Sequence, residues 1–595
     1  MYLPLSSNKH SFCDLALGIS SSSSQKTALG EKYTHSMGMG RQRLIIVGSF
    51  FCIFFLLIAL RLIEVMGLSP NMEGKLKLDD SMKILSCKRN DIVDRNGILL
   101  ATNLKTESLF AVPHQIKNPE GIAQKIVEVL PHLKFEEVLK KLRSDKKFIW
   151  IARNLSPHDQ ARIHRLGVPG LNFHKEEKRV YPHGALLSHV LGFTDVDNQG
   201  IGGIEHQFNE ALVQSEGSLQ LSIDLRIQHI LHDEISKGIE NFQAKGGTGI
   251  VLDVKTGEVL AMVSFPDFDP NFPKKMPPEN LFNRSTLGVY EMGSAFKLLT
   301  VAMALENKTA TLQSQYDASQ PLKVARFRIK DFKPKNRVLS VIEMVQYSSN
   351  IACAKMALEI GVKRQKMFLE KLGLLRAPKI EVPEVGKPMM PQDWRDINLI
   401  TISYGYGVSV SPIALAGALS SLINGGILRE PTLSKVDPTI ERGVRVVSAE
   451  TSRTMQKLLR LVLTHGTAKK GNVPGLMVGG KTSTAEVLLA NGKGYNREQN
   501  LSTFVGAFPM TDPQFLVMIM IDRPIATKET YGYSTGGWTS APIAGNVMGR
   551  MAPLLGVKPI NEQDPKIQAA FYLPGGHNEE KTPSQKTEGF RNAGY

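Results

Sequence analysis

The strongest apolar signal in the chain is the run over residues 44–60, which contains no charge and continues to about residue 66. A helix needs about 20 apolar residues to cross a bilayer, and the flanking Arg61 and Glu64 side chains can reach the interface. We therefore predict a transmembrane anchor over 44–66. The alternatives are a buried core helix and a cleaved signal peptide, but a signal peptide has a shorter apolar region and a small-residue cleavage site.

Basic residues precede this run, with Arg41 and Arg43 directly at its edge. Positive charge marks the cytoplasmic side of an anchor, so residues 1–43 are predicted to be cytoplasmic and the chain beyond about residue 67 extracytoplasmic. The first 43 residues contain SSSSQ and scattered glycines, and 559–595 is also polar. Both ends are predicted to be disordered tails.

Short strands, loops and helices alternate in residues 67–235, which we predict to be a mixed module. Asn96–Gly97 separates two apolar runs and predicts a tight hairpin. Residues 124–147 have an amphipathic pattern that Pro131 divides into two helices.

Strand and helix patterns follow one another in residues 236–558, the second predicted domain. Two strands flank the turn at 255–257, an apolar helix follows Ser294, 341–371 is helical, and 501–522 again predicts two strands around a turn. Strands, then helices, then strands indicate an α+β domain with an antiparallel sheet flanked by helices.

Charge and cysteine content argue against nucleic-acid binding, a disulfide framework and a metal site. The chain has 595 residues and a net charge of +16, but its basic residues are spread out and form no compact run with interleaved aromatics. We therefore predict no nucleic-acid binding; a basic surface suits anionic lipid or a carboxylate-rich polymer equally well. The four cysteines imply no disulfide framework, and no ligand spacing indicates a metal.

The segment YEMGSAFKLL places Ser294 three residues before Lys297 at the start of an apolar helix. Residues three apart share a helix face, so the lysine amine can approach the serine hydroxyl, and burial would lower its pKa enough to make it a base. A helix cap followed by a solvated lysine explains the same pattern. S-x-x-K also occurs at Ser6, Ser23 and Ser144 in polar surroundings, so the spacing alone does not decide.

Two downstream segments favour the catalytic interpretation. YSSNIA places Ser348, Ser349 and Asn350 at a helix start, where they are also ordinary caps. VGGKTSTAE places Lys481, Thr482, Ser483 and Thr484 on a predicted strand, where they offer a cation and hydroxyls to a carboxylate and N–H groups to an oxyanion.

Two other motifs are interpreted as structural. Lys255-Thr256-Gly257 joins two predicted strands, and its glycine suits the turn. Residues 475–482 match the phosphate-binding loop G-x-x-x-x-G-K-T, but that loop needs an apolar strand before it and a helix after it. The preceding HGTAKKGNVP is polar and ends in proline, so we predict no nucleotide site.

In this order, S-x-x-K at 294, S-x-N at 348 and K-T-S at 481 resemble the signature segments of penicillin-recognising serine acyl-transferases. RNDIVDRNGILLAT, GIGGIEHQFNEAL and LDVKTGEVLAMVSFPDFDPN extend the resemblance to class B penicillin-binding proteins over roughly 41–556. ISYGYGVSVSPIALAGAL is most similar to the division-specific, FtsI type. The resemblance implies a membrane anchor, a pedestal module and a β-lactamase-like transpeptidase domain.

The resemblance further implies a serine D,D-transpeptidase that cross-links septal peptidoglycan stem peptides, releases D-alanine and is inhibited by β-lactams. Neither a metal nor another cofactor is expected. Ser294 is the expected nucleophile, Lys297 its base and Ser348 a proton relay.

The remaining positions carried over from the family bind substrate. Asn350 is expected to hold the substrate amide, and Lys481 and Thr482 the terminal carboxylate. The backbone N–H groups of Ser294 and Thr484 are expected to form the oxyanion hole. The implied partners are a lipid-II polymerase of the FtsW type and other division proteins, at the inner membrane with the catalytic domain in the periplasm.

Two positions depart from the family pattern: Ser483 replaces a glycine, and Met292 replaces a proline. A side chain at 483 either crowds the substrate or points away from it. Three alternatives stay open on the sequence alone: an elongation-specific transpeptidase, a hydrolytic β-lactamase, and a degenerate structural component of the division machinery.

Overall fold

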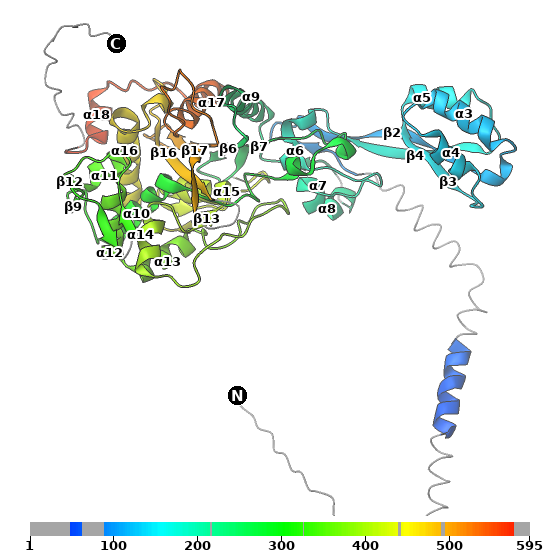
Figure 1. The fold of residues 1–595 in the computed structure, drawn as a ribbon, viewed down its shortest axis with the longest axis horizontal. Coiled ribbons are helices and arrows are strands. Elements are labelled where there is room, and N and C mark those ends of the chain that lie inside the picture. Colours follow the sequence, from blue (N-terminus) through cyan, green and yellow to red (C-terminus); the bar gives the residue numbers. More distant parts are fainter. Residues whose placement is uncertain are drawn as a thin grey trace, which may run out of the picture. The chain divides into compact units, whose positions relative to one another are not determined.

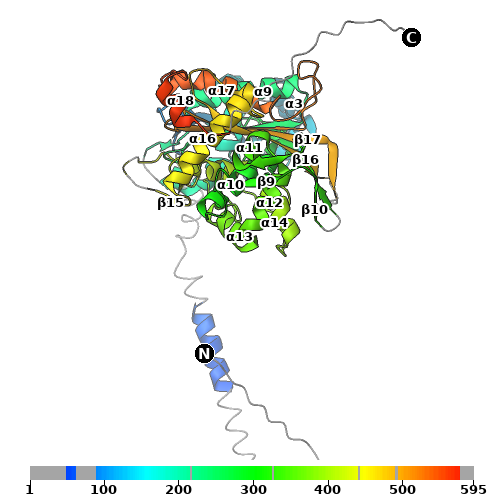
Figure 2. The ribbon, with the colours of Figure 1, turned by 90° about the vertical axis from the view of Figure 1, so that its left-hand side faces the viewer.

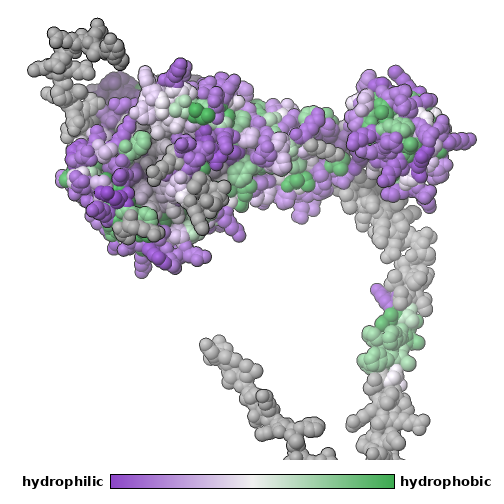
Figure 3. Space-filling view, in the orientation of Figure 1, coloured by the Kyte–Doolittle hydropathy of each residue, from purple (hydrophilic) through white to green (hydrophobic). Residues whose placement is uncertain are grey.

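The structure is a computed structural model that describes residues 48–61 and 89–575, apart from 215–216, 325–326, 438, 440–441 and 489–493. Residues 48–61 form a helix with exposed apolar side chains, dark blue in Figure 1 and largely green in Figure 3. Across the described ranges, no helix is both long and apolar enough to span a bilayer. The predicted anchor 44–66 extends past this helix on both sides, and its flanks and the predicted tail 1–43 lie outside the described residues.

The N-terminal region begins with the predicted hairpin, which is confirmed. Strands β1 (Ile92–Val93) and β2 (Leu99–Ala111) pair antiparallel. Gly97 adopts φ 84° in the turn between them, and its N–H donates to Asp94 O at 3.1 Å. Only glycine adopts this left-handed conformation without steric cost.

Strand β2 continues into a three-stranded antiparallel sheet, pairing with β4 (Leu171–Val180) and β3 (Ile149–Leu155) (Figure 1). Three helices pack with this sheet around one apolar core: α3 (Pro119–Val129), α4 (Phe135–Leu142) and α5 (Pro157–His164). The predicted break at Pro131 is confirmed, because it lies between α3 and α4.

Between this sheet and the second region, short elements surround a buried ion triad. These elements are α6 (Ser188–Leu191), α7 (Gly203–Gln207), α8 (Asn209–Gln214) and β5 (Leu219–Gln220), the last pairing parallel with β1. Glu205 on α7 accepts from Arg89 Nε and Arg179 Nε, each at 2.6 Å. All three side chains are at most 1% exposed, so each charge depends on the others for solvation.

The second region is built on a five-stranded antiparallel sheet in the order β16-β17-β18-β6-β7. Its strands are β6 (Gly246–Asp253), β7 (Val259–Phe265), β16 (Gly479–Leu488), β17 (Tyr495–Phe508) and β18 (Phe515–Asp522). The predicted strand pairs around 255–257 and 512–513 are both confirmed. The sheet has β16 at one edge.

Helices α9 (Leu225–Asn241) and α17 (Ser540–Leu554) cover one face of the sheet (Figures 1 and 2). A Cβ at Gly249 on β6 would lie 2.4 Å from Ile235 Cδ1 and 2.7 Å from Leu231 Cδ1. Glycine at this position therefore allows α9 to pack close to the strand. The predicted boundary between residues 235 and 236 falls inside α9.

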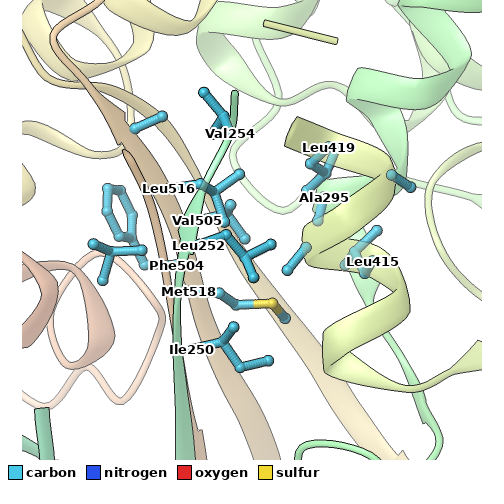
Figure 4. Packing of buried hydrophobic residues seen from close by; sticks show 14 of the residues in the cluster. Ile250, Leu252, Val254, Ala295, Leu415, Leu419, Phe504, Val505, Leu516 and Met518 are labelled. Carbon is cyan, nitrogen blue, oxygen red and sulfur yellow. The ribbon is translucent and has the colours of Figure 1, made fainter. Parts of the chain in front are cut away.

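The other face is covered by α10 (Phe296–Glu306), α15 (Pro412–Ser421) and α16 (Ala449–His465). Figure 4 shows Leu415 and Leu419 of α15 facing Ile250 and Leu252 of β6. Further helices lie on the same side of the sheet in Figure 2: α11 (Val341–Tyr347), α12 (Asn350–Ile360), α13 (Val362–Lys371) and α14 (Asp396–Ser403). The predicted helical region 341–371 is thus three helices, broken at Ser348 and Gly361. Sheet and flanking helices confirm the α+β prediction.

Small two-stranded sheets border this layer. The pairs are β8 (Tyr290–Glu291) with β13 (Ser409–Val410), β9 (Gln315–Asp317) with β12 (Val338–Ser340), β10 (Leu322–Val324) with β11 (Phe327–Ile329), and β14 (Ile427–Leu428) with β15 (Val444–Arg445).

The predicted disorder of the C-terminal tail 559–595 is wrong for its first part. Helix α18 (Pro565–Phe571) forms there, with the Asp564 side chain capping its N-terminus. Glu562 pairs with Arg460 Nη2 at 2.6 Å, and Leu573 is buried. These contacts anchor the segment to the domain; residues 576–595 lie outside the described residues.

The buried triad generates a stability prediction. Glu205→Ala leaves two buried guanidinium groups without a counter-charge and should lower the free energy of unfolding by about 3–5 kcal/mol. Urea unfolding followed by tryptophan fluorescence measures this change. The matched control is Glu120→Ala, which breaks an exposed pair with Arg143 and should cost less than about 1 kcal/mol. Equal losses in the two variants contradict the prediction.

Candidate active site

Ser294 lies in a single 3₁₀ turn, η5 (Gly293–Ala295), directly before α10. The predicted helix start is therefore a tight turn that becomes α-helical only at Phe296. Residues 296–304 of α10 are all buried, as expected for a helix that is apolar on every side. The turn exposes part of Ser294 at the end of a rigid, buried element.

Lys297 projects from the first turn of α10 and is 1% exposed. Its Nζ donates to Ser348 O at 2.5 Å and to Ser348 Oγ at 3.1 Å. Burial lowers the pKa of Lys297 to about 8. The alternative of a solvated lysine is thus contradicted by the structure.

Ser348 connects the lysine to Ser294. It ends α11 in the left-handed conformation, with φ 61° and ψ 45°, and its Oγ donates to Ser294 Oγ at 3.1 Å. A hydrogen-bonded path from Lys297 to Ser294 therefore runs through Ser348 Oγ. The ordinary capping interpretation holds for the neighbouring Ser349, whose side chain accepts from Ala352 N.

Lys481 approaches the same hydroxyl from the edge strand β16. Its Nζ donates to Ser348 Oγ at 3.0 Å and to Thr482 O at 2.9 Å, and its side chain is 1% exposed. Burial and the nearby Lys297 amine lower the pKa of Lys481 well below its usual value. Two amines thus converge on one oxygen.

The side chains of the remaining predicted substrate-binding residues form hydrogen bonds with other segments. Thr482 Oγ1 lies 2.8 Å from Thr467 Oγ1, and Thr484 Oγ1 accepts from Gly536 N at 3.1 Å. Asn350 begins α12, and its Nδ2 donates to Lys330 O at 2.9 Å. The structure therefore joins Ser294, Lys297, Ser348 and Lys481 by hydrogen bonds, with Asn350, Thr482 and Thr484 beside them in the chain.

The two motifs interpreted as structural are confirmed as such. Lys255-Thr256-Gly257 forms the turn between β6 and β7, and Lys255 pairs with Asp512 at 2.7 Å. The nucleotide-loop match at 475–482 runs into strand β16 where a phosphate loop needs a helix. Of the other S-x-x-K matches, Ser144 lies in a loop, and Ser6 and Ser23 lie outside the described residues.

Sequence reasoning missed Asp331. Its Oδ1 accepts from Asn350 N at 2.5 Å and Ile351 N at 3.0 Å, and its Oδ2 from Ser349 Oγ at 2.7 Å. The carboxylate thus caps α12 and restrains the residues that follow Ser348. Asp331 lies 18 to 20 positions before its partners and has no cap spacing that could have identified it.

Glu291 was also missed. It lies in β8, three residues before Ser294, and its Oε1 accepts from Gly407 N at 2.5 Å and Tyr495 Oη at 3.1 Å. Burial raises the pKa of Glu291. The side chain ties the segment leading to the nucleophile turn to the 405–407 loop and to β17.

Comparison with known families agrees with this geometry. The chain matches the penicillin binding protein transpeptidase domain over residues 247–549 and the penicillin-binding protein dimerisation domain over residues 84–241. It is 37% identical to the probable peptidoglycan D,D-transpeptidase FtsI of Caulobacter vibrioides, over 79% of this chain and 82% of that protein. The chain belongs to the class B penicillin-binding proteins of the FtsI type. The family resemblance predicted from the sequence is confirmed.

Two further relatives support the assignment to the penicillin-binding proteins. The peptidoglycan D,D-transpeptidase FtsI of Escherichia coli K12 is 29% identical over 83% of this chain and 88% of its own. The crystal structure of a peptidoglycan glycosyltransferase from Burkholderia ambifaria matches with a TM-score of 0.50 and 31% identity, covering 57% of this chain and 99% of that one. Over the part of the chain that it covers, that solved structure shares the fold described above.

The cap formed by Asp331 generates a testable prediction. Asp331→Ala removes three hydrogen bonds at the N-terminus of α12 and should lower the free energy of unfolding by about 1–3 kcal/mol. Thermal unfolding measures the loss. The control is Asp437→Ala, where an exposed carboxylate accepts from Thr439 N and Oγ1 remote from α12. If Asp331→Ala and the control unfold at the same temperature, the cap contributes nothing to stability.

Proposed function

We propose that the protein is a serine D,D-transpeptidase that cross-links peptidoglycan stem peptides at the division septum. The single observation that supports this function best is the hydrogen-bonded cluster of Ser294, Ser348, Lys297 and Lys481. It couples a partly exposed hydroxyl to buried amines, as a serine nucleophile without a histidine requires. The names of the relatives support peptidoglycan as the substrate and cell division as the process.

In the proposed first step, Ser294 Oγ attacks the carbonyl carbon of the penultimate D-alanine. Its proton passes through Ser348 Oγ to the neutral amine of Lys297, which reverses the direction of the resting hydrogen bonds. The C–N bond to the terminal D-alanine then breaks, and the leaving nitrogen takes a proton from the same relay. An ester on Ser294 remains, and β-lactams would stop the reaction at this stage.

The proposed substrate contacts pair each polar group of the substrate with a complementary group of the protein. A terminal carboxylate beside Lys481 and Thr482 would raise the pKa of the Lys481 amine and so stabilise its charged form. Asn350 would hold the substrate amide. The N–H groups of Ser294 and Thr484 would bind the oxyanion.

In the proposed second step, an amine of a neighbouring stem peptide attacks the ester carbonyl. A new C–N bond forms, the C–O bond to Ser294 breaks, and the amine proton returns through Ser348 to the Ser294 oxygen. The product is the cross-link, and the serine is ready for another cycle.

We also propose that residues 44–66 anchor the chain in the inner membrane, with 1–43 cytoplasmic and the catalytic domain in the periplasm. The uncharged run 44–60 and the exposed apolar helix 48–61 support this topology. The proposed division of the chain is then a pedestal at 67–235, a catalytic domain at 236–558 and a C-terminal tail. A lipid-II polymerase of the FtsW type and other division proteins are the proposed partners.

Removal of the proposed nucleophile tests the function directly. Full-length protein purified in detergent should form a stable covalent adduct with a fluorescent penicillin, and Ser294→Ala should abolish labelling. The matched control is Ser144→Ala, which alters another S-x-x-K match and should label fully. Labelling that survives Ser294→Ala, or no labelling of the intact protein, would contradict the proposal.

The lowered pKa of Lys297 predicts a pH dependence. The reactive form is the neutral amine, and with a pKa of about 8 only about a tenth of it is neutral at pH 7. The acylation rate constant for penicillin should therefore rise by about tenfold from pH 6 to pH 7 and level off above pH 8. Stopped-flow acylation from pH 6 to 9.5 measures the profile, with circular dichroism as a check on folding. A rate that is flat or falls as pH rises toward 8 contradicts Lys297 as the base.

A further inference from the structure

The side chain of Ser483 points to the nucleophile turn and not into open space. Its Oγ donates to Met292 O at 2.6 Å, and the residue is 3% exposed. Side chains alternate along a strand, so Ser483 lies on the same face of β16 as Lys481, whose amine reaches Ser348. The sequence left open whether the Ser483 side chain crowds the substrate or points away from it. In the structure its hydroxyl is hydrogen-bonded beneath the nucleophile turn.

The nucleophile turn packs closely against two neighbouring segments. Gly293 has φ 49°, and its N–H donates to Gly405 O at 3.1 Å. A Cβ at Gly293 would lie 2.7 Å from Ser483 Oγ and 3.1 Å from Thr484 O. The turn therefore packs directly on the 405–407 loop and on the edge strand.

The hydroxyl of Ser483 supplies the short hydrogen bond to the Met292 carbonyl. Ala295 N also donates to Met292 O, but at 3.4 Å, which is long for an N–H···O bond. Met292 is 2% exposed, so loss of the hydroxyl would leave a buried carbonyl with only this weak partner. The hydroxyl of Ser483 therefore holds the turn against β16.

We propose that Ser483 is a positioning residue that sets the distance between the two N–H groups of the oxyanion hole. This inference rests on the proposed function, which assigns those groups to Ser294 and Thr484. Ser483 directly precedes Thr484, and its partner Met292 lies two residues before Ser294. One side-chain hydrogen bond therefore ties the strand that carries one donor to the turn that carries the other.

The role is one of geometry and not of chemistry. Ser483 Oγ donates to a backbone carbonyl and lies under the turn, so it need not touch the substrate. Oxyanion donors act only when both are within hydrogen-bond distance of the developing charge, and a shift of about 1 Å costs about 100-fold in rate. Ground-state binding through Lys481 and Thr482 does not depend on that spacing.

The test separates the acylation rate constant from the dissociation constant of the preceding complex, by stopped flow with a fluorescent penicillin and the full-length protein in detergent. In Ser483→Ala and Ser483→Gly the acylation rate constant should fall by about 10- to 100-fold, while the dissociation constant stays within about twofold of the unmodified value. Ser483→Thr keeps the hydroxyl and should recover most of the rate. Titration with excess penicillin counts the competent protein, so a misfolded fraction does not lower the rate constant.

The matched control is Ser222→Ala. Ser222 is fully buried, and its Oγ donates to Val259 O at 2.8 Å, away from the nucleophile turn. It should lose stability without slowing acylation. A normal acylation rate constant in Ser483→Ala and Ser483→Gly would overturn the inference, as would an equal fall in Ser222→Ala. Failure of the proposed function would instead appear as no acylation of the unmodified protein.

Discussion

Two lysine amines buried against one serine hydroxyl are the constraint on which the site depends. Lys297 and Lys481 are each 1% exposed, and both donate to Ser348 Oγ. Desolvation opposes both charges, and each charge opposes the other, so the pair holds a proton less readily than lysines in water. A neutral amine near a hydroxyl is a base, and a charged one beside it attracts a carboxylate. Burial therefore favours the neutral base, and a substrate carboxylate beside Lys481 would offset the cost of charging that second amine.

The fold provides this burial from three separate segments. Helix α10 is surrounded by apolar contacts and holds Lys297 in a fixed direction. Ser348 adopts a left-handed conformation that costs about 1–2 kcal/mol for a residue with a side chain, and the cap from Asp331 restrains the segment that follows it. Lys481 projects from β16, the edge strand of the sheet, and its amine reaches Ser348 Oγ. The hydrogen bonds and packing around Ser348 thus offset the cost of its left-handed conformation.

The features that could be predicted from the sequence are those set by residues close together in the chain. The spacing of Ser294 and Lys297, the turn at Asn96–Gly97 and the antiparallel strand pairs follow from short-range rules, and each is present in the structure. The assembly of Lys481 with Ser348 came only from the order of motifs in a known family, because no periodicity joins residues 133 positions apart.

What the sequence did not predict depends on tertiary contacts. The partners of Asp331 are brought to it by folding, and so is the carbonyl that binds Ser483. The hydrogen-bonded path from Lys297 through Ser348 to Ser294 is likewise a property of the packed structure. Helix α18 is different, because Asp564 followed by Pro565 is a readable start signal that the polar composition of the tail outweighed.

A crystal structure of the penicillin-acylated protein tests the central claim most directly. We expect an ester on Ser294 Oγ, with Ser348 Oγ still within hydrogen-bond distance of both lysine amines and the drug carboxylate beside Lys481. An ester on another residue, or a Ser348 hydroxyl separated from both amines in the acylated protein, would contradict it.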